Sequence, residues 1–203
     1  MYKNFTRPDS VRRQKEMVDC FARLLQTVPY EKLTVRRLCA EMNISRTVFY
    51  RYFESRNDLA NALVDHLVLM LVADERALPS LLDENPDFLG WFRFWKSRMP
   101  LWQALQCSGL DSRLTAALLE LVRREHLLPL QRKVGAVEFS LLQVRLHTVM
   151  YLIISMTAEW MRMGLAQPEE IMAGFCKEFL QRPLLQPQNG RGDRQGTKST
   201  GTR

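Results

Sequence analysis

Two short helices joined by a tight turn constrain the fold of this chain more than any other feature. Thr34 and Ser45 can each cap a helix, because a hydroxyl oxygen accepts a hydrogen bond from a free amide of the first turn. Asn43 stands between the two helices and tolerates the left-handed backbone that a tight turn requires. Two such helices packed on a preceding helix form a helix-turn-helix, which the sequence therefore predicts in its first quarter.

A longer helix is predicted before this pair, beginning near Asp9 or Ser10 and ending before Pro29. The apolar residues of all three helices recur at helical spacing. They are Val11, Val18, Phe21, Leu24, Leu25 and Val28 in the first helix, and Val35, Leu38, Met42, Ile44, Phe49 and Phe53 in the two short helices. The pattern indicates one apolar core shared by three helices.

The remainder of the chain is also predicted to be helical, so the expected fold class is all-α. Helices are expected at residues 55–82, 86–105, 111–126, 137–163 and 168–182. Ser55, Asn85 and Asp111 can cap the first three of them. Pro100 is expected to kink or divide the second.

Positive charge is concentrated at the two ends of the chain. Residues 1–56 hold 12 Lys/Arg and 6 Asp/Glu, residues 57–182 hold 13 and 15, and residues 183–203 hold 4 and 1. A basic first quarter with interleaved aromatic residues suggests a polyanion as partner, such as DNA. The alternative is an ordinary solvated charged surface.

The outward face of the second short helix carries the first residues that we expect to contact DNA. Arg46 and Thr47 lie near its N-terminal end, where a recognition helix meets base edges in the major groove. Arginine can bond guanine through two donors, and threonine can contact a thymine methyl group. The hydroxyls of Tyr50 and Tyr52 suit phosphate oxygens. The alternative is that both tyrosines are half-buried packing residues.

Two further cations flank this helix. Arg36, in the preceding helix, can reach the edge of the groove. Arg56 begins the next helix, where its charge and the free backbone amides can together hold a phosphate. Alternatively, these arginines only make the surface soluble.

The segment "LTVRRLCAEMNISRTVFYRYFESRNDL" (residues 33–59) resembles the DNA-binding signature of the TetR family of transcriptional regulators. That signature is roughly Thr-Val-Arg-x-Ile-Ala, then Gly-Val-Ser, then Tyr-x-x-Phe, then Lys before an acidic residue and Leu. The matching positions are Thr34, Val35, Arg36, Leu38, Asn43, Ile44, Ser45, Tyr50, Phe53, Arg56, Asp58 and Leu59. The resemblance covers the first quarter of the chain. It implies that Arg36, Arg46, Thr47, Tyr50, Tyr52 and Arg56 face DNA.

The chain departs from the signature at several positions. Asn43 replaces the usual Gly, Cys39 replaces the common Ala, and Arg56 replaces Lys. Val48 stands where many members have a Thr that contacts phosphate, so that contact is not expected here. In the family, the residues matching Arg46 and Thr47 vary and set the sequence preference.

The resemblance also implies a second domain that dimerises and often binds a small molecule. The expected division is a helix-turn-helix DNA-binding domain at 1–54, a helical ligand-binding and dimerisation domain at 55–185, and a disordered basic tail at 186–203, whose composition cannot support a core. The last two predicted helices carry more apolar residues than one face needs. Two copies can therefore form a four-helix bundle, and the homodimer would bind a palindromic double-stranded operator. Repression is the common behaviour of the family.

An aromatic stripe in the fifth helical segment is the candidate lining of a ligand site, although such a stripe is more often plain core. The candidate ligand-binding residues are Trp91, Trp95, Met99 and Trp102, with His147 and Tyr151 as polar groups. An effector bound there would be mostly apolar. The alternative is a regulator without a small-molecule effector, controlled by a partner protein or by oxidation of Cys39. Cys39 can equally be a small buried filler.

Other protein classes lack support in the sequence. The four cysteines are far apart, no Cys/His cluster has the spacing of metal ligands, and no catalytic or phosphate-binding motif stands out. We therefore expect no enzyme activity, no cofactor and no metal. The N-terminus lacks the apolar stretch of a signal peptide, and "TVMYLIISMTA" is shorter than the roughly 20 residues needed to span a bilayer. A cytoplasmic protein without membrane contact is expected.

Overall fold

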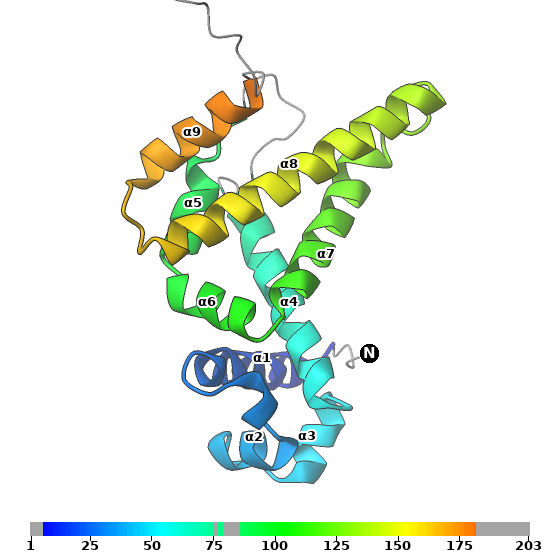
Figure 1. Ribbon diagram of the computed structural model, residues 1–203. Helices are drawn as coiled ribbons and strands as arrows, with labels where there is room; N and C mark the ends of the chain where they lie inside the picture. Colours follow the sequence, from blue (N-terminus) through cyan, green and yellow to red (C-terminus); the bar gives the residue numbers. More distant parts are fainter. Residues whose placement is uncertain (1–5, 75–76, 79–85, 182–203) are drawn as a thin grey trace, which may run out of the picture.

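The computed structural model describes residues 6–74, 77–78 and 86–181, and over these residues the chain is all-α, as predicted (Figure 1). The elements are α1 (Pro8–Leu25), the 3-10 turn η1 (Tyr30–Lys32), α2 (Val35–Glu41), α3 (Arg46–Tyr52), α4 (Arg56–Ala73), α5 (Leu89–Lys96), α6 (Met99–Cys107), α7 (Asp111–Val122), the π-helical turn η2 (Arg123–Leu127), α8 (Ala136–Arg162) and α9 (Glu169–Gln181). Helices α1 to α3 lie at one end of the molecule, and α5 to α9 lie at the other. The expected tail at 186–203 lies outside the described residues.

The helix-turn-helix forms as the sequence predicts. The Thr34 hydroxyl accepts a hydrogen bond from the Arg37 amide, and the Ser45 hydroxyl accepts one from the Val48 amide, both at 3.2 Å. Asn43 has a φ of 49°, the left-handed conformation expected for the turn. The start of α1 was predicted less well. The helix begins at Pro8, whose fixed φ suits the first helical position, and no side chain caps it.

Helix α4 joins the two ends of the molecule (Figure 1). The Ser55 hydroxyl accepts a hydrogen bond from the Asp58 amide at 3.2 Å, so the predicted cap is confirmed. The helix ends at Ala73, well before residue 82, because Asp74 has an extended backbone. The remainder of the predicted helix falls largely at residues 75–76 and 79–82, which lie outside the described part of the chain.

Two other helix starts differ from the prediction. Helix α5 begins at Leu89 and not at residue 86, since the Asp87 carboxylate accepts a hydrogen bond from the Leu89 amide at 2.9 Å. The predicted cap Asn85 is not among the described residues. Asp111 is the first residue of α7 and not its cap. Pro100, by contrast, lies in the first turn of α6 and divides the aromatic segment as expected.

An aromatic cluster forms the core of the C-terminal helices α5–α9. Four tryptophans and several phenylalanines are buried in it, and neighbouring rings meet edge to face. The indole N–H of Trp91 donates to the Thr157 hydroxyl at 2.8 Å, which in turn donates to the Ile153 carbonyl at 2.7 Å. These bonds connect α5 to α8 inside the core.

Helix α8 is apolar on more than its core-facing side. By length and composition alone it is able to cross a membrane. A single helix of this kind is a weak indication of a membrane protein, because core helices of soluble bundles share the property. Here α8 packs against α5, α7 and α9.

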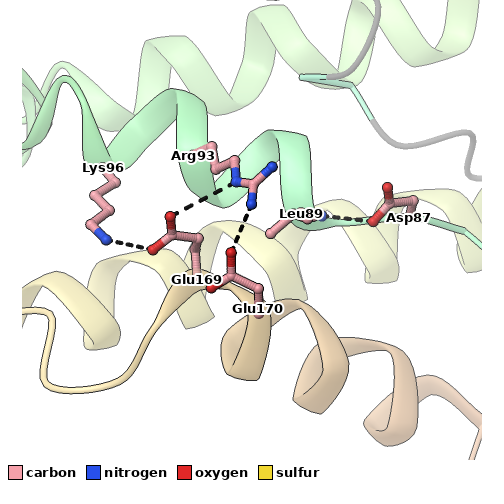
Figure 2. A network of polar contacts seen from close by, with 6 residues as sticks. All are labelled: Asp87, Leu89, Arg93, Lys96, Glu169 and Glu170. Atoms are coloured by element: carbon pink, nitrogen blue, oxygen red, sulfur yellow. Dashed lines mark hydrogen bonds and ion pairs between the residues drawn. The ribbon is translucent and has the colours of Figure 1, made fainter.

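Ion pairs fasten the start of α9 to α5 (Figure 2). Arg93 lies 2.7 Å from the Glu170 carboxylate and 3.8 Å from that of Glu169. Lys96 forms an ion pair and a hydrogen bond with the other Glu169 oxygen. The position of α9 is therefore tied to the helix that carries Trp91 and Trp95.

Candidate DNA-binding surface

The outer face of α3 presents a group of exposed polar side chains. Arg46, Thr47 and Tyr50 are exposed on it, and Arg36 is exposed on α2. Helices α2 and α3 form the tip of the molecule farthest from α8 and α9 (Figure 1). Four of the six expected DNA-contacting residues thus lie on a surface open to a large ligand.

The inner face of α3 fixes which residues point outward. Phe49 and Phe53 are fully buried, and their ring centroids are 5.9 Å apart. A helix of seven residues with these anchors has little freedom to rotate about its axis. Arg51 is also exposed near the end of α3, and the sequence reasoning did not single it out. The sequence feature that could have identified it is its positive charge between Tyr50 and Tyr52.

Tyr52 does not lie on the exposed surface. Its side chain is 7% exposed and belongs to the core of the first three helices. The reason is helical spacing, because Tyr52 follows Phe49 by three residues and shares its buried side. Tyr52 is therefore better interpreted as a packing residue. Tyr50, by contrast, is 49% exposed and can reach a ligand.

Arg56 is directed to another part of the protein. Its Nη1 donates to the backbone carbonyls of Tyr30 at 3.0 Å and Glu31 at 3.1 Å, and the guanidinium carbon lies 4.6 Å from the Tyr30 ring centroid. The expected phosphate contact through this group competes with these bonds. Arg56 therefore holds η1 against the start of α4.

Cys39 is buried, with 6% of its surface exposed. Burial raises the pKa of its thiol, and the positive charge of Arg46 opposes that change only in part. A thiol held in its neutral form reacts slowly with oxidants. The structure thus favours the interpretation of Cys39 as a small apolar filler.

The family of the N-terminal region follows from a match to known proteins. Residues 22–63 match the family model described as bacterial regulatory proteins, tetR family. This region therefore resembles the N-terminal region of TetR-family regulators. The match spans the end of α1, the helix-turn-helix and the first half of α4, so it includes every residue of the surface described above.

Several known proteins resemble the chain in sequence. The nucleoid occlusion factor SlmA of Shewanella loihica (strain ATCC BAA-1088 / PV-4) is 27% identical over 77 residues, which is 38% of each chain. SlmA of Shewanella woodyi (strain ATCC 51908 / MS32) gives the same identity over the same length. The chain thus spans about two fifths of the length of the curated relatives it matches.

Solved structures resemble the chain over most of its length. A putative TetR-family transcriptional regulator from Syntrophomonas wolfei str. Goettingen has a TM-score of 0.58 at 15% identity, covering 85% of this chain and 94% of that one. A TetR transcriptional regulator from Streptococcus agalactiae 2603V has a TM-score of 0.54 at 15% identity, with coverage of 86% and 96%. At these identities the likeness concerns the fold.

The expected ligand-binding residues are only partly brought together in this fold. Trp91, Trp95 and Trp102 share the aromatic core, with Met99 partly buried beside it. The indole N–H groups of Trp95 and Trp102 are buried without a hydrogen-bond partner. His147 is partly buried on α8. Tyr151 is 53% exposed and does not join the tryptophans, because it lies on the outer face of α8.

Proposed function

We propose that this protein is a dimeric, sequence-specific DNA-binding transcriptional regulator of the cytoplasm. The observation that carries the proposal is the outward group of Arg46, Thr47 and Tyr50 on α3 of a TetR-family domain. Arg46 and Thr47 read base edges in the major groove, and Tyr50, Arg36 and Arg51 contact the phosphate backbone.

The dimer proposal rests on apolar side chains left exposed on the last two helices. They are Val137, Leu141, Val144 and Tyr151 on α8, and Ile171, Phe175 and Phe179 on α9. On each helix their spacing of three, four or seven residues places them on one face. Exposed apolar faces of this extent mark association surfaces. A second copy would cover them in a four-helix bundle and place two recognition helices for a palindromic operator.

The regulation proposed is repression released by a small, mostly apolar effector. The aromatic core of α5–α9 supports this, because Trp95 and Trp102 each bury an indole N–H that lacks an acceptor. An effector with a hydrogen-bond acceptor among apolar groups would satisfy such a donor. Thermal shift against a panel of hydrophobic ligands tests the idea. A flat response across the panel would count heavily against an effector.

A regulator controlled by a partner protein is the second candidate. Leu69 is 65% exposed and Val72 is 47% exposed, and both lie on α4 and not on the helices of the proposed dimer faces. The similar SlmA proteins carry the name nucleoid occlusion factor, which describes a role other than effector-released repression. Under this alternative, Leu69→Glu abolishes regulation in cells while purified protein still binds its operator. The first candidate predicts that regulation survives this change.

Selection of bound sequences from a random DNA pool, at near-physiological salt, tests the central proposal. The wild type is expected to enrich a palindrome, and Arg46→Ala is expected to lose preference at defined positions while still binding DNA. Arg51→Ala is the matched control, since it removes the same charge from the same helix at the phosphate side. Binding without any enrichment would reject the proposal in favour of non-specific DNA binding.

A further inference from the structure

A chain of hydrogen bonds joins the C-terminal helices to the first turns of α4. Arg113, in the first turn of α7, donates from Nη1 to Asn61 Oδ1 at 2.9 Å. The same nitrogen lies 3.4 Å from the Asn57 backbone carbonyl, which it also bonds. Asn57 and Asn61 are four residues apart and therefore lie on one face of α4. That face is turned toward α7 at the boundary with the DNA-binding domain.

The chain of contacts continues from Asn57 into the DNA-binding domain. The Tyr30 hydroxyl, in η1, donates to Asn57 Oδ1 at 2.5 Å. Burial raises the pKa of Tyr30, although the charges of Arg56 and Arg113 oppose this, so the phenol keeps its proton and its role as donor at neutral pH. The Tyr30 ring packs edge-on against Phe21 of α1.

Both partners in this chain are anchored in their own part of the molecule. Tyr30 is 8% exposed and lies in η1, shortly before Thr34, which caps α2. Arg113 stands one position before Leu114, which is 2% exposed and packs in the core of the C-terminal helices. A shift of α7 relative to α4 would therefore strain the contacts of Asn57, which also accepts the hydrogen bond from Tyr30 of η1.

We propose that Arg113, Asn57 and Asn61 form an interdomain latch that positions the helix-turn-helix relative to the C-terminal helices. This inference rests on the proposed dimeric operator binding. In such a dimer the C-terminal helices determine the position of each DNA-binding domain, and the latch determines its orientation. The three residues are positioning residues, because none of them lies on the outer face of α3. The latch sets the half-site spacing that the dimer selects.

Specific and non-specific DNA binding depend on the latch to different degrees. A palindrome is read only when both recognition helices sit about one helical turn apart, roughly 34–36 Å. Phosphate contacts form in any register and carry no sequence information. Loosening the latch therefore lowers affinity for the operator and widens the tolerated spacing, while affinity for random duplex is kept. Loss of a DNA-contacting cation would instead lower both.

The test measures binding of full-length variants to the operator selected by the wild type, to a random duplex, and to operators with spacers changed by one or two base pairs. Arg113→Ala is expected to lose about tenfold in operator affinity, within the usual range of coupling between sites. It is expected to keep random-duplex affinity and to bind altered spacers relatively better. Asn61→Ala should act in the same direction, and the double variant should be no worse than Arg113→Ala, since that change already removes the contact with Asn61.

Arg123→Ala is the matched control. It removes the same charge just after α7, but its guanidinium pairs with Glu120 one turn away. Asn61→Asp keeps an acceptor opposite Arg113 and is expected to retain the spacing preference of the wild type. If Arg113→Ala unfolds early, Asn61→Ala provides the same readout from an exposed position on α4.

The inference and the proposed function fail in different ways. A wild type that selects no palindrome overturns the proposed function. If the wild type selects a palindrome while Arg113→Ala and Asn61→Ala keep its ratio of operator to random-duplex affinity and its spacing preference, that result overturns the latch alone. Losses that add in the double variant would also overturn it, because independent contacts would then explain them.

Discussion

The guanidinium of Arg56 stacks on the ring of Tyr30, with 4.6 Å between the guanidinium carbon and the ring centroid, and donates to the backbone carbonyls of Tyr30 and Glu31. Helix α4 is thereby fastened to the loop that precedes α2. A lysine cannot reproduce this arrangement, because its ammonium group is neither planar nor able to stack in the same way.

Replacing Arg56 should therefore lower stability more than it changes electrostatic attraction to DNA. We expect Arg56→Lys to lose about 1 kcal/mol of unfolding free energy, close to the loss in Arg56→Ala, although lysine keeps the charge. Chemical denaturation measures both. Arg51→Ala, which removes an exposed arginine of α3, serves as control for charge. A stable Arg56→Lys variant with normal DNA binding would instead assign Arg56 to phosphate binding.

The hydrogen bond between Trp91 and Thr157 makes a second prediction. Thr157→Val keeps the side-chain shape but leaves the buried Trp91 N–H without an acceptor, so unfolding free energy should fall by about 1–3 kcal/mol. Adding Trp91→Phe removes the unpaired donor and should cost less than the sum of the two single changes. Urea unfolding gives the values. Thr157→Ser, which keeps the hydroxyl, should lose less than Thr157→Val, and the reverse order would contradict the assignment.

The exposed faces of α8 and α9 predict the assembly state. Leu141→Glu or Phe175→Glu should convert a dimer to a monomer, because either change places a charge in an apolar interface. Light scattering coupled to size-exclusion chromatography measures the mass. Leu69→Glu is the control, since Leu69 is 65% exposed and Leu141 is 66% exposed, but Leu69 lies on α4. Dimers in all three variants would place the interface elsewhere.

The ion pairs between α5 and α9 predict a pH dependence. The hydrogen bond from Lys96 is the main reason that the pKa of Glu169 is lowered from its ordinary value of 4.5. A carboxylate whose pKa is lower in the folded than in the unfolded state stabilises the fold above about pH 4.5, and this stabilisation is lost as the pH falls through the folded-state value. Glu169→Gln should therefore show a smaller drop in Tm on acidification than the wild type.

Lys96→Met provides the complementary test of this ion pair. It should flatten the same acidic part of the Tm profile, and combining it with Glu169→Gln should flatten it no further. Thermal unfolding between neutral and strongly acidic pH gives the profiles. Identical slopes in the wild type and Glu169→Gln would show that the pair does not contribute.

Local features of the fold could be predicted from the sequence because they depend on neighbouring residues. The caps Thr34, Ser45 and Ser55 each bond an amide three residues away, and Asn43 requires only its own backbone conformation. Proline effects are equally local, and Pro100 divides α5 from α6 as expected. Helical spacing also predicts the burial of Tyr52, because it follows Phe49 by three residues and therefore lies on the same side of α3.

Long-range contacts could not be predicted in this way. The role of Arg56 depends on η1, which lies about 25 residues earlier in the chain. Arg113 meets Asn61 across 52 positions, and neither residue has an unusual local pattern. From the sequence, Trp91 and Tyr151 are assigned to one ligand site, Trp91 as part of the apolar lining and Tyr151 as a polar group. The orientation of α8 about its own axis, relative to α5, places the two side chains apart. Helical periodicity within one segment does not determine that orientation.

The placement of the tryptophans has an optical consequence. All four tryptophans of the chain, Trp91, Trp95, Trp102 and Trp160, are buried among α5–α9, and the first 90 residues contain none. Indole emission therefore reports on the C-terminal helices alone, whereas Tyr30, Tyr50 and Tyr52 are among the chromophores of the other end. Unfolding of the two parts can be followed separately in one cuvette. A fluorescence change on adding DNA to the unlabelled protein would show that binding at one end alters the environment of the tryptophans at the other, through α4 or through the contact between α1 and α6.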